Sequence, residues 1–359
     1  HDEAAEVMMV GPFGDWLRYS YDDRPVLVQE CDGVRIITSS KLEVLHRVPD
    51  SLVSIFSIGS TSPAALLLDA REHFERGSAK ADEFLRAAGA ELPAAVAECI
   101  EAACHERDPP RQRLLLQAAV YGRAFCQEFP RDRVKEACTA LRVLNAVRHH
   151  EVGIPLSWPQ YQQLTPQVLI HRLVNAHHHL LALRIAECIE EDPRRIVLHW
   201  AGAKIASTGA TPDTEVEAML VAKLKLCPGV SYAAVAACAY RAGRPRLAAN
   251  LLEHEPCAGE QVPLLTSIGE GGKALASAVE SGDTDLVYLA LFHLWQKAQA
   301  DPGGRQDFYR LITARPLSRD LFLRYCRARE PELAQTLYQT MGMPDAAAVA
   351  HVRDAFAGL

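Results

Sequence analysis

The segment ACAYRAGRPRLAANL, residues 237–251, is echoed 39 residues later by ASAVESGDTDLVYLA, residues 276–290. In both segments small residues lead to a glycine, Gly243 or Gly282, and leucines follow at helical spacing. Glycine readily adopts the positive φ that commonly ends a helix, so each segment predicts two helices that fold back on one another. One pair cannot bury its own apolar face, and a period near forty residues therefore indicates an α-solenoid of stacked pairs.

This interpretation places Leu286 on the inner face of the second helical pair. An unpaired carboxylate in an apolar core is costly. We therefore expect Leu286→Asp to destabilise the fold by several kcal/mol if that side chain is buried.

From Ser62 onward the chain contains residues that typically start and end helices. Ser62 suits an N-cap and Pro63 suits the first helical position, and the apolar residues that follow predict one long helix as far as Leu85. Breaks that contain proline then recur, and apolar residues spaced three and four apart follow each of them. These breaks lie near Pro93, Pro109, Pro130, Pro159, Pro193, Pro212 and Pro228. The intervals predict helices of roughly 10–16 residues joined by short loops.

The first sixty residues have a different pattern. Short β-prone runs occupy 7–10, 26–29, 34–38 and 52–58, and the Asp-Gly pair between the second and third runs predicts a hairpin. Four short strands do not form an independent sheet with protected edges. The segment is therefore interpreted as the end of a β-propeller. The predicted organisation is residues 1–60 as terminal β-propeller strands and residues 61–359 as α-solenoid, in a mostly α fold.

The composition favours helix packed on helix and argues against several classes of function. Of the 359 residues, 49% are hydrophobic and only 7% aromatic, and the net charge is −7. Lys and Arg are scattered, which argues against nucleic-acid binding and against a polybasic membrane surface. The ten cysteines form no CxxC pair, which fits a reducing compartment. We find no signal peptide and no apolar run long enough to cross a bilayer, so we expect a cytosolic protein.

A run of three histidines is the most prominent polar motif. Consecutive residues splay around a helix, so His177, His178 and His179 cannot all ligate one ion. The run stands where Gly243 and Gly282 stand in the later segments. It is therefore interpreted as a turn between helices.

Two further motifs have simple structural interpretations. The glycine-rich segment 269–273 lacks the first glycine and the final Ser or Thr of a phosphate-binding loop, and it is interpreted as a loop between helices. Asp283 and Asp285 are interpreted as the N-cap and a first-turn acid of a helix over 283–299. We also find no catalytic motif elsewhere in the sequence. The prediction is no enzyme, no catalytic residue, no metal and no cofactor.

Apolar residues recur at helical spacing near the C-terminal end. Their face is expected to be covered by a further repeat or by a partner protein. With Leu333 beside them, the candidate interface residues are Leu321, Phe322, Tyr325, Leu337 and Tyr338.

Several segments resemble the family of vacuolar protein sorting-associated protein 16. They follow one another in the family's order over nearly the whole chain, and the match becomes looser after about residue 300. The segments are DGVRI at 32–36, PAALLL at 63–68, LRVLNAVR at 141–148, GIPL at 153–156, PGVSY at 228–232, GEQVPLL at 259–265 and ESGDTDLV at 280–287.

The resemblance implies a scaffold subunit of the membrane tethering complexes HOPS and CORVET, with a β-propeller followed by an α-solenoid. It implies recruitment of a Sec1/Munc18-type protein, vacuolar protein sorting-associated protein 33, for SNARE-mediated fusion. It also implies other class C tether subunits as partners and a peripheral location on late endosomes and vacuoles or lysosomes. The family's docking region for the Sec1/Munc18-type protein lies mostly or wholly beyond Leu359, so no binding residue is carried over.

Two alternatives from other classes stay open at this point. A cytosolic receptor for short peptides, of the tetratricopeptide type, would need a face lined with Asn, Lys and Arg, and we do not locate one in the sequence. An enzyme would need polar residues that converge on a pocket with a ligand or metal.

Overall fold

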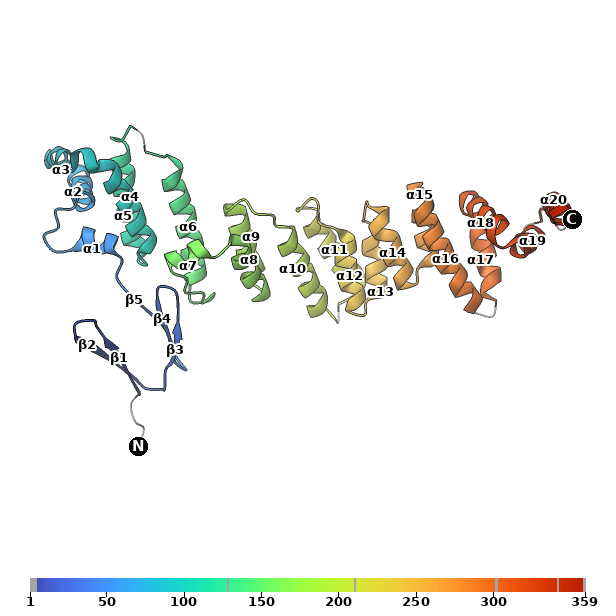
Figure 1. Cartoon of the computed structure of the whole chain (residues 1–359), viewed down its shortest axis with the longest axis horizontal. Coiled ribbons are helices and arrows are strands. Elements are labelled where there is room, and N and C mark those ends of the chain that lie inside the picture. The colour runs from blue at the N-terminus through green and yellow to red at the C-terminus, as the bar shows by residue number, and fades with distance from the viewer. Residues whose placement is uncertain (1–4, 128, 210, 301–302, 341, 358–359) are drawn as a thin grey trace. The chain divides into compact units, whose positions relative to one another are not determined.

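The computed structural model describes residues 5–357 apart from 128, 210, 301–302 and 341. Helices dominate it and follow a short β segment (Figure 1). The chain divides into two compact units, unit 1 (His1–Glu191) and unit 2 (Asp192–Leu359). Each unit contains a core of buried apolar side chains. The predicted mostly α fold, with helical pairs after a short β segment, is confirmed.

The β segment forms two small antiparallel sheets, one of strands β1 and β2 and one in the order β3-β4-β5. The predicted hairpin is confirmed as the β3–β4 connection, whereas β2 and β5 were not predicted. The strands are β1 (Ala5–Val10), β2 (Trp16–Tyr21), β3 (Val26–Gln29), β4 (Gly33–Ile37) and β5 (Leu42–His46).

Apolar side chains are exposed on both faces of these sheets. In β2, Trp16 is 57% and Leu17 is 55% exposed, and in β3, Val26 is 59% and Leu27 is 53% exposed. Adjacent residues of a strand point to opposite faces. Within the described residues, β2 and β3 therefore carry uncovered apolar side chains on either side.

Residues 52–58, predicted as a strand, lie instead in and just after helix α1 (Asp50–Phe56), so that prediction is wrong. The amide of Leu52 donates to the carbonyl of Pro49 at 3.0 Å, which starts the helix. Ile55, only 5% exposed, then joins the core of unit 1. Packing against neighbouring helices outweighs the β preference of the branched residues here.

The long helix predicted after Ser62 is two helices, α2 (Pro63–Glu75) and α3 (Lys80–Ala88). The predicted N-cap is confirmed, because Ser62 Oγ accepts from the amide of Ala65 at 3.2 Å. The break lies at Gly77, whose φ is +65°. This left-handed residue turns the chain, and α3 folds back against α2.

Helices α4, α5, α6 and α7 begin at or beside the predicted proline breaks, whereas α8 begins at Pro166 and α9 at His179, where no break was predicted. In this unit α2, α4 and α5 pack mutually, and α6 packs on α4 and α5. The helices of unit 1 after α3 are η1 (Gly89–Glu91), α4 (Leu92–His105), α5 (Pro109–Arg123), α6 (Asp132–Arg148), α7 (Trp158–Gln163), α8 (Pro166–Asn175) and α9 (His179–Cys188).

A hydrogen bond joins the β segment to the helices of unit 1. Gln160 Nε2 donates to Asp32 Oδ1 at 2.9 Å, from α7 to the β3–β4 turn. Ser157 and Gln160 also form the capping box of α7, so their positions are fixed by the helix start. Burial alone would raise the pKa of Asp32, but hydrogen bonds from Ser157 and Gln160 outweigh it and hold the pKa below its usual value.

We expect Asp32→Asn to remove a contribution to stability that depends on pH. Because the folded-state pKa of Asp32 is depressed, its contribution is present above the unfolded value of about 3.9 and is lost as pH falls through the folded value. Melting temperatures of the two proteins should therefore differ most at pH 6 and converge below about pH 4. A difference that grows as pH falls would contradict the assignment.

Unit 2 consists of helices that stack in antiparallel pairs. The first helix of each pair packs against the first helix of the next, so α10 contacts α12, α12 contacts α14, and α14 contacts α16. The helices are α10 (Arg194–Ser207), α11 (Asp213–Leu224), α12 (Tyr232–Arg241), α13 (Pro245–Leu252), α14 (Ala258–Ile268), α15 (Gly271–Ser281), α16 (Thr284–Ala300), α17 (Gly304–Thr313), α18 (Pro316–Arg329), α19 (Pro331–Thr340) and α20 (Pro344–Ala357).

The period near forty residues is wrong as a structural repeat. The first helices of successive pairs, α10, α12, α14, α16 and α18, are 38, 26, 26 and 32 residues apart, so no single period holds. The echo of 39 residues relates α12 to α15, which is the second helix of the next pair. Small residues followed by a glycine of positive φ end both α12 and α15, so the echo reflects a shared type of helix end.

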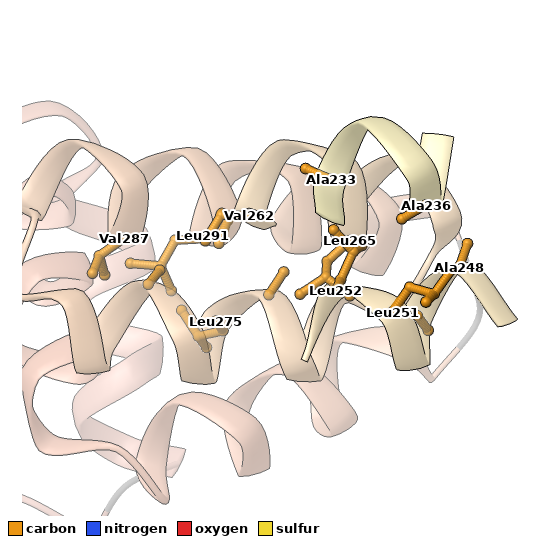
Figure 2. Close-up of a cluster of buried hydrophobic side chains, with 14 of the residues drawn as sticks. Ala233, Ala236, Ala248, Leu251, Leu252, Val262, Leu265, Leu275, Val287 and Leu291 are labelled. Atoms are coloured by element: carbon orange, nitrogen blue, oxygen red, sulfur yellow. The ribbon is translucent and has the colours of Figure 1, made fainter. Parts of the chain in front are cut away.

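The burial pattern within the echo is nevertheless shared. Ala239 and Ala278 are both 0% exposed, as are Ala248 and, 39 residues later, Val287. Figure 2 shows such alanines and leucines in a continuous band between helices α12–α16. Leu286 is only partly buried, and Leu291 is the fully buried leucine of α16.

The three histidines lie at a helix end, as predicted. His177 has φ +62°, in the place of Gly243 with φ +76° and Gly282 with φ +73°. The amide of His178 donates to the carbonyl of Leu173 at 2.9 Å, which closes the C-terminal turn of α8. The left-handed residue at the end of α8 is therefore a histidine, whereas α12 and α15 end with glycine.

Glu190 is the other non-glycine residue with a left-handed backbone among the described residues, at φ +59°. Its side chain is exposed at the end of α9. We expect Glu190→Gly to stabilise the chain by about 0.5–1 kcal/mol, because glycine adopts this φ without steric cost. The matched control is Glu187→Gly inside α9, which should destabilise by about 1 kcal/mol. Urea unfolding measures both, and equal signs for the two variants would contradict the argument.

Candidate functional site

The five apolar residues predicted as an interface lie on α18 and α19, and three of them are core residues. Phe322 and Leu337 are 0% and Tyr338 is 2% exposed. The ring of Phe322 lies 5.1 Å from that of Phe308 and 5.7 Å from that of Trp295, measured between centroids. Helices α16 and α17 of the same unit therefore cover Phe322, which the sequence pattern could not reveal.

Leu321 and Tyr325 are only partly buried. The Tyr325 ring meets Phe292 edge-on with centroids 4.7 Å apart, and Tyr288 Oη donates to the Leu321 carbonyl at 3.3 Å. Of the predicted set, these two residues are the ones with surface left for a partner. An interface at this place remains a proposal.

The histidine run has a geometry that the sequence argument did not foresee. His177 and His178 lie before the first residue of α9, so the three side chains do not splay as they would on one helix. The rings of His177 and His179 meet edge-on with centroids 5.6 Å apart.

The glycine-rich segment 269–273 is a loop only at Gly269 and Glu270, and the prediction is wrong for Gly271, Gly272 and Lys273, which form the first turn of α15. It joins α14 to α15 and does not follow a strand. Lys273 Nζ donates to Glu253 Oε1 at 2.7 Å, and this hydrogen bond raises the pKa of the lysine. A Cβ at Gly271 would lie 2.4 Å from Leu294 Cδ2, so this glycine lets α15 approach α16 closely. Packing and an ion pair thus explain these residues.

Three buried thiols are poorly suited to nucleophilic chemistry. Burial raises the pKa of Cys99, Cys104 and Cys326 to about 12. A thiol with so high a pKa carries little thiolate at neutral pH, and the thiolate is the nucleophile. We assign these cysteines to packing.

A groove in unit 1, which we call the α5–α6 groove, is lined mainly by apolar surface. It has a volume of about 710 Å³ and lies between α5 and α6, with the end of α2 beside it. Its apolar lining consists of Phe74, Leu116, Val120, Tyr121, Cys138 and Leu141.

Aromatic and aliphatic side chains of this groove are open to solvent. Phe74 is 60% and Val120 is 50% exposed. The Tyr121 ring lies 5.0 Å from Phe74 and 5.2 Å from Phe125, itself 53% exposed, so three aromatic rings form one cluster. Contiguous exposed apolar surface of this kind commonly marks an interaction site.

The walls of the groove are held in place from beneath. A Cβ at Gly122 would lie 2.7 Å from Leu67 Cδ2 and 2.8 Å from Val96 Cγ2, so α5 packs tightly on α2 and α4 only because Gly122 has none. Gln112 is 4% exposed, and Asn145 Nδ2 donates to its Oε1 at 2.7 Å. In return Gln112 Nε2 donates to Asn145 Oδ1 at 3.2 Å, which ties α5 to α6. The groove is therefore preformed.

The sequence of α5 contains a signal for this groove. Helix α5 buries Leu115, Ala118, Ala119 and Gly122 on one face. A second row, Leu116, Val120 and Tyr121, lies beside the first at helical spacing. A helix with two apolar rows has more apolar surface than one core contact needs. Only the fold shows that α6 stands beside the second row.

Stacked antiparallel helices and apolar surface hollows define an α-solenoid protein, a class whose surfaces bind other proteins. None of the described helices combines the length and the apolar character that crossing a membrane requires. The family region described as "Vps16, N-terminal region" matches residues 3–136, and "Vps16, C-terminal region" matches residues 230–358. The chain belongs to the Vps16 family.

Curated relatives agree with this assignment. Protein VACUOLELESS1 of Arabidopsis thaliana is 55% identical over 337 residues, which are 94% of this chain and 39% of that protein. The vacuolar protein sorting-associated protein 16 homolog of Dictyostelium discoideum is 42% identical over 314 residues, 88% of this chain and 37% of that protein. The Drosophila melanogaster homolog is 32% identical over 351 residues, 97% of this chain and 41% of that protein. The chain thus spans about two fifths of the length of these relatives.

Proposed function

We propose that this chain is part of a vacuolar protein sorting subunit that acts as a scaffold for other proteins. The observation that carries the proposal is the family match at both ends of the chain, residues 3–136 and 230–358, around a framework of stacked helical pairs. Stacked pairs present extended surfaces for protein partners. The names of the relatives, which place them in vacuolar protein sorting, support the process.

In finer terms, we propose a role in the tethering complexes HOPS and CORVET. There the subunit recruits a Sec1/Munc18-type protein, vacuolar protein sorting-associated protein 33, for SNARE-mediated membrane fusion. The complex holds it at the surface of late endosomes and vacuoles or lysosomes, together with the other class C subunits. The family resemblance of the segments at 141–148 and 280–287 supports this assignment.

We propose that the role involves no catalysis. The high pKa values of the buried thiols and the pairing of Lys273 with Glu253 argue for structural roles of these groups. A scaffold acts instead through the distance and orientation it gives its partners.

The β segment is proposed to be the end of a β-propeller, with residues 1–60 as its terminal strands and residues 61–359 as α-solenoid. The exposed apolar side chains on both sides of β2 and β3 support this, since a larger β structure would cover them. Asp32 and Gln160 then join the propeller to the first helices of the solenoid.

The test is a pull-down of purified, folded Sec1/Munc18-type protein by this chain and, in parallel, by a version extended past Leu359. Each is also made with Tyr325→Asp, and with Leu317→Asp as a matched control on the same helix, where Leu317 is 40% exposed. Capture by the extended version supports the proposed function. If Tyr325→Asp abolishes capture of the partner and Leu317→Asp does not, part of the docking surface lies at Leu321 and Tyr325.

Other outcomes separate the function from the interface. Capture by the extended version alone would make this chain a spacer and would remove Leu321 and Tyr325 from the interface. If neither version captures the folded partner, the proposed partnership is contradicted.

A further inference from the structure

The α5–α6 groove offers a surface two helical turns long. Its wall on α5 runs from Arg113 through Leu116 and Val120 to Tyr121. At 1.5 Å per residue these positions extend over about 12 Å. Apolar residues at i, i+3 or i+4, and i+7 of a second helix extend over about 10.5 Å, so two turns of an amphipathic helix match the wall.

The charges around the groove are mainly positive, although the chain as a whole carries −7. Arg71 pairs with Glu75, and its Nη2 donates to Gln117 Oε1 at 2.9 Å. Arg113 and Arg142 are exposed, and we find no acidic partner for them among the described residues. Two arginines at the rim of an apolar groove favour an acidic occupant. A second copy of this acidic chain is disfavoured by charge repulsion.

We propose that the α5–α6 groove binds an amphipathic helix of a partner protein, with apolar anchors seated among Phe74, Val120 and Leu141 and acidic residues facing Arg113 and Arg142. Exposed aromatic rings and arginines are the residue types that contribute most to binding at interfaces. The preformed walls lower the entropic cost of association, because Gly122 and the Gln112–Asn145 pair fix them before binding. This assignment is independent of the proposed Sec1/Munc18 partnership.

The test uses the whole chain and three synthetic helical peptides of fifteen residues with blocked ends. The first has Leu at i, i+4 and i+7 with Glu on both flanks, the second replaces Glu by Lys, and the third scrambles the Leu positions. Fluorescence anisotropy measures binding. We expect saturable binding of the Glu peptide and at least ten-fold weaker binding of the other two. No saturable binding of the Glu peptide at 100 μM, or equal binding of the scrambled peptide, overturns the proposal.

Variants of the chain locate the binding site. Val120→Asp should weaken binding of the Glu peptide at least ten-fold. Leu180→Asp, a matched change at a 65% exposed leucine on α9, should leave that binding unchanged. Arg142→Glu should weaken binding of the Glu peptide and strengthen binding of the Lys peptide. Damage to the fold would not produce such a reversal. If Val120→Asp and Leu180→Asp reduce the affinity for the Glu peptide equally, the assignment of the binding site to the groove is overturned. A dimer of the unmodified chain in sedimentation that Val120→Asp dissociates would make a second copy the occupant and overturn it as well.

Discussion

Leu291→Asp is expected to destabilise unit 2 by at least about 4 kcal/mol, because it places a carboxylate without a partner in a closed apolar core. Leu291 is 0% exposed and packs within the cluster that joins α12–α16, where Figure 2 shows it between helices. For a unit of this size, that loss lowers the melting temperature by about 8–16 °C. Thermal unfolding followed by circular dichroism measures it.

The same helix provides the control. Leu289 is two residues away and 45% exposed, so Leu289→Asp should change stability by less than about 0.5 kcal/mol. If the two variants unfold at the same temperature, the buried face of α16 has been placed incorrectly. Leu286→Asp should fall between them, since Leu286 is partly buried.

Gly122→Val is expected to have the second largest effect, a destabilisation of unit 1 by about 3 kcal/mol. The new side chain would begin at a Cβ 2.7 Å from Leu67 and 2.8 Å from Val96, so α5 must move away from α2 and α4. In an exposed helix the removal of glycine would instead stabilise by up to about 1 kcal/mol. The sign of the effect therefore distinguishes close packing from ordinary helix propensity.

Urea unfolding of Gly122→Val beside Ala124→Val tests this. Ala124 is exposed at the C-cap of the same helix, so the added methyl groups meet solvent there. We expect a change of less than about 1 kcal/mol for Ala124→Val. Stabilisation by Gly122→Val would contradict the tight approach of α5 to α2 and α4.

The α5–α6 groove and the candidate interface residues on α18 and α19 offer a partner protein different kinds of surface. Phe322, Leu337 and Tyr338 are already covered by their own unit, so only Leu321 and Tyr325 are available there. The α5–α6 groove has exposed aromatic rings, preformed walls and two arginines. The pull-down experiment tests the C-terminal surface and the peptide experiment tests the groove, so the two proposals are tested independently.

The sequence by itself determined the local features of this protein. Ser62, Pro63 and the later prolines mark helix starts, and Gly243 and Gly282 mark helix ends, because capping and positive φ depend on residues close in the chain. The hairpin at Asp32-Gly33 was predictable for the same reason. The short segments that resemble the family, such as 141–148 and 280–287, can also be recognised from the sequence alone.

Only the tertiary structure decided which faces meet. It made 52–56 helical rather than extended, gave the helical pairs spacings of 26 to 38 residues where the echo indicated 39 throughout, and buried Phe322 beneath α16 and α17. It also placed α6 beside the second apolar row of α5 and so formed the groove. These outcomes depend on contacts between residues far apart in the chain, where packing outweighs local preference, and spacing along the sequence does not record such contacts.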